Sequence, residues 1–80
     1  MSEKRVHLTF LGKVVEEPII SSLIHQVPVE VNIRRANISK ESGFMELGIT
    51  GSESDVLKAI AFLESKQVRV DALGGDVLES

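Results

Sequence analysis

An internal duplication constrains this chain more than any other feature of its sequence. A single shift, which carries position 8 onto position 47, superimposes three separate segments of the 80 residues. Two copies are too few for a stacked repeat array, which needs at least about three. The sequence therefore predicts one duplicated strand–helix–strand unit. The matching segments are Leu8-x-Phe10-x-Gly12 with Leu47-x-Ile49-x-Gly51, Leu23-Ile24 with Phe62-Leu63, and Val29-x-Val31-x-Ile33 with Val68-x-Val70-x-Ala72.

In the first half, hydrophobic periodicity predicts a strand, a helix and a second strand. Gly12 ends the first strand, and Glu16-Glu17-Pro18 opens a helix with acids at its positive end and proline at its first position. Pro28 stops the helix, and the second strand runs to about Ser39. The residues expected to face inward are Val6, Leu8, Phe10, Ile20, Leu23, Ile24, Val27, Val29, Val31 and Ile33.

The second half repeats this order after a turn at Lys40-Glu41-Ser42-Gly43. Ser52 is the expected N-cap of a helix that Lys66 closes, and a polar tail that begins at Gly74 is expected to fray. The inward residues predicted for this half are Met45, Leu47, Ile49, Val56, Ala59, Ile60, Leu63, Val68, Val70 and Ala72.

The duplication and the hydrophobic periodicity both predict an α+β chain of the ferredoxin-like type, with the order βαββαβ. Right-handed crossovers place both helices on one face of a four-stranded sheet of order 4-1-3-2. The second strand is then an edge. We expect one domain over residues 1–80, with its core at about 6–73 and a flexible tail at 74–80.

Composition argues against several classes of function. Nine basic and 12 acidic residues give a net charge of −3, and only three aromatic residues occur, so nucleic-acid binding is not expected. The absence of Cys removes thiolate metal sites and cysteine nucleophiles. The longest apolar run, from Ala59 to Leu63, is too short for a membrane span, and no signal peptide is evident. We expect a cytoplasmic location.

No enzyme is predicted. Ser21 and His25 lie four positions apart on a helix, but no acidic residue is placed there to orient the imidazole, and no glycine elbow presents a nucleophile. Two distant histidines do not form a metal site, and no cofactor is expected. Asn32 and Arg34, on one face of the second strand, suit a carboxylate. The alternative is that Arg34 and Arg35 are solvated edge charges.

Alternation leaves one face of the sheet uncovered, with apolar residues near the second-strand hairpin. Such a face is either an interaction surface or carries scattered surface hydrophobes. The small size of the chain favours self-association, and pairing of edge strands is one geometry for it. The residues assigned to this face are His7, Thr9, Asn32, Arg34, Ala36, Ile38, Phe44, Glu46, Gly48, Thr50, Arg69 and Asp71.

From about Val6 to Leu73 the chain resembles the NIL domain family. The resemblance rests on these ordered motifs: Leu8-Thr9-Phe10-x-Gly12, Glu17-Pro18-Ile19-Ile20-Ser21-x-Leu23, Val31-Asn32-Ile33, Gly48-x-x-x-Gly51 and Ala59-Ile60-x-x-Leu63. The family includes the C-terminal regulatory domain of bacterial methionine-import ATPases, stand-alone proteins, and domains joined to iron–sulfur modules. The resemblance thus implies a non-catalytic, ligand-sensing domain.

In the transporter version, paired domains bind L-methionine at their interface, and binding inhibits uptake. The resemblance implies a homodimer that binds methionine or a related amino acid, with a transporter or an iron–sulfur protein as its partner. Asn32 and Ile33 match the family motif, whereas Arg34 stands where the motif has Leu. We expect the ligand site to comprise Asn32, Ile33, Arg34, Ile38 and Phe44. The alternative is a ligand-free interaction module that docks through the uncovered face.

Overall fold

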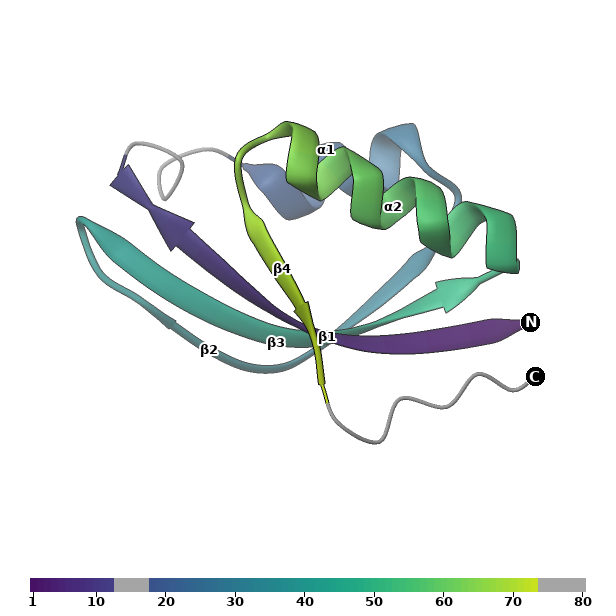
Figure 1. The fold of residues 1–80 in the computed structure, drawn as a ribbon, viewed down its shortest axis with the longest axis horizontal. Helices are drawn as coiled ribbons and strands as arrows, with labels where there is room; N and C mark the ends of the chain where they lie inside the picture. Colours follow the sequence, from purple (N-terminus) through teal and green to yellow (C-terminus); the bar gives the residue numbers. More distant parts are fainter. Residues whose placement is uncertain (13–17, 74–80) are drawn as a thin grey trace.

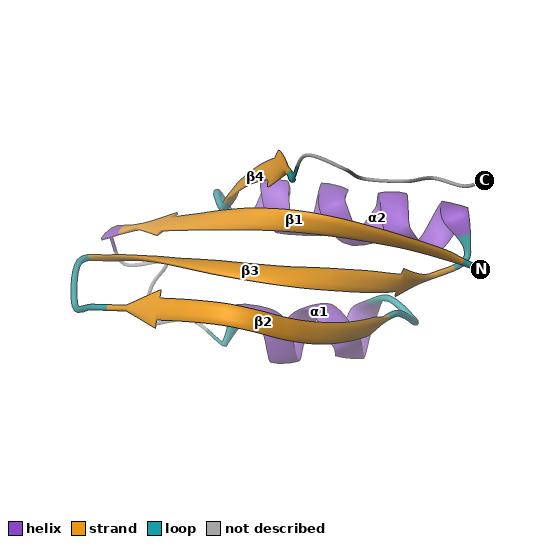
Figure 2. Cartoon of the chain, turned by 90° about the horizontal axis from the view of Figure 1, so that it is seen from below, coloured by secondary structure: helices purple, strands orange, loops and turns teal. Residues whose placement is uncertain are grey.

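The two halves of the chain build one antiparallel sheet with two helices on the same side of it (Figure 1). A computed structural model describes residues 1–12 and 18–73. The sheet order β2-β3-β1-β4 is the predicted 4-1-3-2 order read from the opposite edge, so the ferredoxin-like fold is confirmed (Figure 2). The elements are β1 (Ser2–Leu11), α1 (Ile19–Gln26), β2 (Glu30–Ile38), β3 (Ser42–Gly51), α2 (Glu53–Ser65) and β4 (Arg69–Ala72).

The core lies between the sheet and the helices. Side chains of β1 and β3 that are inaccessible to solvent, such as Leu8 and Leu47, meet Leu23 of α1 and Leu63 of α2. This arrangement follows from strand alternation on one side and a spacing of three to four residues on the other. The buried apolar set is Val6, Leu8, Phe10, Ile19, Leu23, Val27, Leu47, Ile49, Val56, Ala59, Leu63 and Val68.

Two predictions about α1 were wrong in detail. Ile24, expected to face inward, is 48% exposed, and the buried stripe of the helix instead begins at Ile19. Pro18 precedes the first helical residue rather than occupying that position. The predictions for Glu16-Glu17 and for the tail from Gly74 fall outside the described residues.

The predicted cap of α2 is confirmed. The backbone N–H of Asp55 donates to Ser52 Oγ at 3.0 Å, and this bond satisfies a donor that the first helical turn leaves unpaired. Ser52→Ala should therefore lower the free energy of unfolding by about 1 kcal/mol in urea titrations. The control is Ser54→Ala, at an exposed position of the same turn, which should change it by less than about 0.5 kcal/mol. Equal losses in the two variants would contradict this role.

A bulge in β2 changes which residues face the helices. Ile33 pairs with Leu47 of β3, but the next pair joins Arg35 to Glu46, so Arg34 is an extra residue. Beyond the bulge, the alternation of side chains is shifted by one position. Ala36 and Ile38 therefore lie opposite Met45 and Gly43 on the helix side, and the prediction that both lie on the uncovered face was wrong. Arg35 and Asn37 take their places, opposite Glu46 and Phe44.

Candidate functional site

The strand β2 forms one edge of the sheet, and its residues from Asn32 to Ile38 are all exposed. Of the five predicted site residues, Asn32, Ile33 and Arg34 are consecutive in the middle of this strand. Ile38 lies six residues after Asn32, roughly 20 Å away at the rise of a β-strand. Phe44 belongs to β3 and faces the opposite side of the sheet from Ile38. The structure thus brings three of the five together and separates the other two.

Asn32 lies beside a glycine on the uncovered face of the sheet. It pairs with Gly48 of β3, and Gly48 pairs on its other side with Arg5 of β1. The Glu3 carboxylate lies over this glycine, because a Cβ at position 48 would stand 2.8 Å from Glu3 Oε2. Side chains directly opposite on neighbouring strands stand about 4.5–5.5 Å apart at Cβ. Gly48 therefore has Asn32 beside it on β2 and the Glu3 carboxylate over it.

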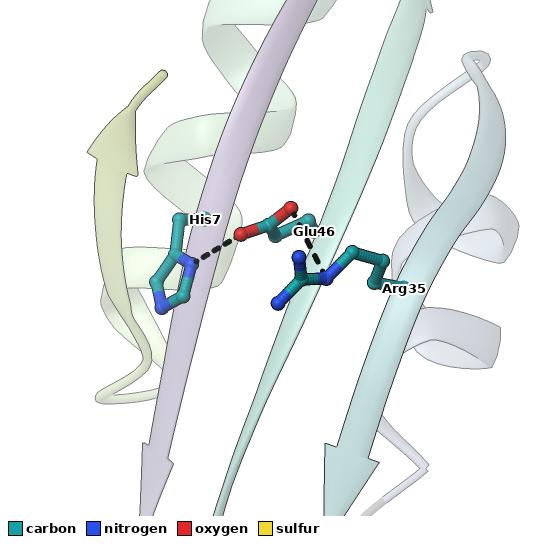
Figure 3. Close-up of polar contacts among 3 residues, drawn as sticks. All are labelled: His7, Arg35 and Glu46. Atoms are coloured by element: carbon teal, nitrogen blue, oxygen red, sulfur yellow. Dashed lines mark hydrogen bonds and ion pairs between the residues drawn. The ribbon is translucent and has the colours of Figure 1, made fainter. Parts of the chain in front are cut away.

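A cluster of side chains lies on the uncovered face, and Figure 3 shows three of its members, His7, Arg35 and Glu46. Glu46 lies between His7 and Arg35, with its carboxylate oxygens 3.3 Å from His7 Nδ1 and 3.7 Å from Arg35 Nε. The ring of Phe44 stacks on His7 with centroids 5.3 Å apart, and the Arg35 guanidinium lies 5.5 Å from the Phe44 centroid. The cluster thus spans three strands and engages Phe44 in contacts within the chain.

Sequence reasoning placed Phe44, His7 and Glu46 on the uncovered face correctly, but it missed the cluster. The pairing of β1 with β3 would have revealed part of the cluster, because His7 lies directly opposite Glu46. Arg35 lies opposite Glu46 only because of the bulge in β2. Pairs this exposed contribute about 0–1 kcal/mol each, so the cluster positions side chains more than it stabilises the fold.

Two hollows lie near the β2–β3 hairpin, one on each side of the sheet. The one on the uncovered face has a volume of about 450 Å³ and is lined by Phe44, His7, Thr9 and Asn37 among others. The one on the helix side has a volume of about 210 Å³, and Phe10, Ile20, Ile38 and Met45 line it together with the start of α1. The second hollow is mainly apolar, since isoleucine and methionine side chains form much of its wall.

Large apolar side chains are exposed along the helix side of the β2 edge. Ile33 is 51% exposed and Ile38 46%. Ile20 and Ile24 are four residues apart and so share one flank of α1. Because Ile20 lines the hollow with Ile38, this flank faces β2. We call Ile24, Ile33 and Ile38, together with the outer edge of β2, the β2-edge surface.

The histidine of α1 contacts the backbone of its own helix. His25 Nδ1 lies 2.7 Å from the backbone oxygen of Ser21, to which it donates in the corresponding tautomer, so the ring engages a carbonyl rather than a hydroxyl. Within residues 1–12 and 18–73, no three His, Asp or Glu side chains gather in a way that suits a metal ion. Neither helix described by the structure is long and apolar enough to span a membrane.

Comparison with known proteins finds a matching family model and related proteins. The model of the NIL domain family matches residues 4–72. The methionine import ATP-binding protein MetN of Bacillus subtilis is 36% identical over 76 residues, which are 90% of this chain and 22% of that protein. A MetN 2 of Acinetobacter baylyi is 36% identical over 74 residues, covering 88% of this chain and 22% of its own length. This chain therefore spans about a fifth of these relatives.

A solved structure shares the fold. The C-terminal domain of an ABC transporter ATP-binding protein from Enterococcus faecalis superimposes with a TM-score of 0.77 at 30% sequence identity. The match covers 90% of this chain and 84% of that one, so the similarity extends over both folds.

Proposed function

This chain belongs to the NIL domain family, and from that premise we propose that it is a non-catalytic regulatory domain. It binds L-methionine or a related amino acid at the interface of a homodimer. Its partner is a methionine importer, since its relatives are ATP-binding proteins of such importers, and it acts on the cytoplasmic side of the membrane. An iron–sulfur partner stays a prediction from the resemblance alone.

The observation that carries this proposal is the surroundings of Asn32. Its amide provides a donor and an acceptor at an exposed edge, and the Glu3 carboxylate lies over the adjacent Gly48. Arg34 follows two positions along the same edge. An amino acid carries an ammonium group and a carboxylate a few ångströms apart. Glu3 suits the ammonium group, Arg34 suits the carboxylate, and Asn32 between them is able to bond either.

The apolar part of the site comes from the helix side of the same edge. Ile33 follows Asn32 and turns to that side, where about half of its surface stays open to solvent. A thioether side chain that crosses the edge would bury part of this isoleucine and gain about 25 cal/mol for each square ångström covered. Ile38 and Phe44 lie too far from Asn32 to join this site within one chain. We therefore confine the proposed site to Asn32, Ile33 and Arg34, with Glu3 beside them.

Isothermal titration calorimetry with L-methionine, D-methionine and norleucine tests the proposal. Asn32→Ala should weaken L-methionine binding about 10- to 100-fold, because hydrogen bonds to charged groups contribute about 1.5–3 kcal/mol. Asn37→Ala is the matched control, since Asn37 is also exposed on β2 and faces the same side of the sheet. The control should leave the affinity within about twofold. No heat at millimolar L-methionine, or equal losses in both variants, would refute this site.

One observation favours the alternative, a ligand-free module that docks through the uncovered face. The hollow of about 450 Å³ beside Phe44 is large enough to receive a side chain of a partner protein. Under this alternative, the thermal midpoint of the domain would not respond to any of the 20 amino acids at 10 mM. A ligand with a dissociation constant 100-fold lower than its concentration would instead stabilise the domain by about 2.7 kcal/mol.

A further inference from the structure

The bulge in β2 brings a second amide onto the uncovered face, away from Asn32. Beyond the extra residue Arg34, Asn37 lies opposite Phe44 of β3, and Thr9 of β1 lies on the other side of Phe44. Bulges occur often beside functional sites, where they re-aim a side chain. We propose that the hollow at this end of the uncovered face binds a neutral purine, adenine or adenosine, independently of the amino-acid site at Asn32.

The hollow is a separate site from the one proposed at Asn32. Asn37 lies five residues after Asn32, roughly 16 Å along the strand at its usual rise. The volume of the hollow, about 450 Å³, is within the range of small-ligand sites, about 300–1,000 Å³. None of the residues proposed to bind the amino acid lines this hollow, so the two sites are able to bind different ligands.

The lining of the hollow is polar but uncharged apart from a histidine. Its polar members are the hydroxyl groups of Thr9, Ser39 and Ser42, the Asn37 amide and the His7 ring. Among residues 1–12 and 18–73, no lysine, arginine, aspartate or glutamate lines it. A carboxylate or phosphate group bound there would lose water without gaining an opposite charge. The hollow therefore suits a neutral ligand with several hydrogen-bonding groups rather than an amino acid.

Three of these polar side chains have no partner within the described part of the chain. Those of Thr9, Asn37 and Ser42 make no hydrogen bond to any residue that the structure describes. Ser39 differs, because its Oγ donates to the backbone oxygen of Ser42 at 2.9 Å. Two hydroxyl groups and one amide, each able both to donate and to accept, are therefore available to a ligand.

Phe44 provides an aromatic wall for the hollow. His7 stacks on its ring with 11° between the two planes, and the Arg35 guanidinium lies 5.5 Å from the ring centroid. Both neighbours come from the row of Glu46, on the far side of Phe44 from the hairpin, and Glu46 contacts both of them (Figure 3). The hollow instead extends toward the hairpin, to Ser42. A planar heterocycle in it would stack on that side of a ring already held in place.

Asn37 favours adenine among the planar heterocycles. Its amide carries a donor and an acceptor side by side, and asparagine forms paired hydrogen bonds of this kind with N6 and N7 of adenine. Hypoxanthine has two acceptors, O6 and N7, at the same edge, so one amide does not match both. The hydroxyl groups of Thr9 and Ser42 remain for the other ring nitrogens or for the ribose of adenosine.

NMR titration of the isotope-labelled chain with adenosine tests the proposal. We expect a dissociation constant of about 0.1 mM, as ordinary ligand efficiency gives for a molecule of this size, with the largest amide shifts near Asn37 and Phe44. Inosine should bind about 10-fold more weakly. Adenosine monophosphate should bind no more tightly than adenosine, because no lysine or arginine of the described chain lines the hollow. No shift at about 5 mM adenosine, or clearly tighter binding of the monophosphate, would overturn the proposal.

Two variants identify the side chains that bind. Asn37→Ala should weaken adenosine binding about 10-fold or more, because it removes the paired hydrogen bonds. Phe44→Leu should weaken it about 10- to 100-fold, because it removes the stacked ring and keeps an apolar side chain. Asn32→Ala is the matched control, since it makes the same change on the same strand and face but outside the hollow. Equal losses in Asn37→Ala and Asn32→Ala would overturn the site.

The two alanine variants also separate this inference from the proposed function. Asn32→Ala should lose affinity for L-methionine and keep its affinity for adenosine, and Asn37→Ala should do the reverse. A chain that binds adenosine but no amino acid would uphold this inference and refute the proposed ligand. A chain that binds L-methionine but not adenosine would overturn this inference alone.

Discussion

Leu8→Ala is expected to lower the free energy of unfolding by about 2–5 kcal/mol, the largest effect of any single substitution considered. Leu8 is fully buried in β1, a central strand, between Met45 of β3 and Val70 of β4. Removing three carbons there leaves a cavity that neighbours on both sides cannot fill without moving. A domain of 80 residues has a total stability of only about 4–12 kcal/mol, so this loss is a large share of it.

Urea titration followed by circular dichroism measures this loss, and Leu11→Ala is the matched control. Leu11 ends the same strand, but 66% of it is exposed, so its truncation should cost less than about 0.5 kcal/mol. The cavity account fails if the two variants have the same midpoint. Should Leu8→Ala not fold at all, Leu8→Val should still fold, with an intermediate loss of roughly 1 kcal/mol.

Gly43→Ala should cost about 1–3 kcal/mol, because the added carbon has no room. Its Cβ would stand 2.5 Å from Ile38 Cδ1, which is able to rotate away, and 3.0 Å from the backbone atoms Asn37 O and Ile38 Cα, which are not. The hairpin between β2 and β3 would have to open slightly to accept it. We expect faster amide hydrogen exchange in residues 36–45, along with the loss of stability.

Gly48→Ala is the control for this substitution, since Gly48 lies in the same strand. The added Cβ would meet only the end of Glu3, an exposed and flexible side chain, at 2.8 Å. Movement of Glu3 should relieve the contact at a cost below about 1 kcal/mol. If Gly48→Ala proved the more damaging of the two, the distinction between rigid backbone and mobile side chain would be wrong.

The fold could be predicted because two independent patterns agree on it. The duplication sets the number of strands and helices, and the alternation of Val6, Leu8 and Phe10 sets which side of β1 is buried. Which side of α1 is buried was not determined in this way. Ile19, Ile20, Leu23, Ile24 and Val27 offer more apolar positions than one buried stripe needs, and the sequence alone did not distinguish Ile19 from Ile24 as its member.

The site was harder to predict because of one residue in β2. A bulge has no characteristic composition when its extra residue is not glycine, and Arg34 resembles any other polar residue of an edge strand. Strict alternation up to the bulge placed Asn32 correctly, beside Gly48. Past the bulge the same rule placed Ala36 and Ile38 on the wrong side. The contact of Arg35 with Glu46 depends on the same shift, so this part of the cluster was also missed.

The unequal lengths of the outer strands have a consequence for assembly beyond two copies. A sheet whose two borders were equally long and bare would recruit further chains at both ends and grow into a fibre. Here β2 has nine residues and β4 has four. If two copies paired through β2, the longer border of each would be used and only the short ones would stay outermost, which would disfavour further growth of the sheet.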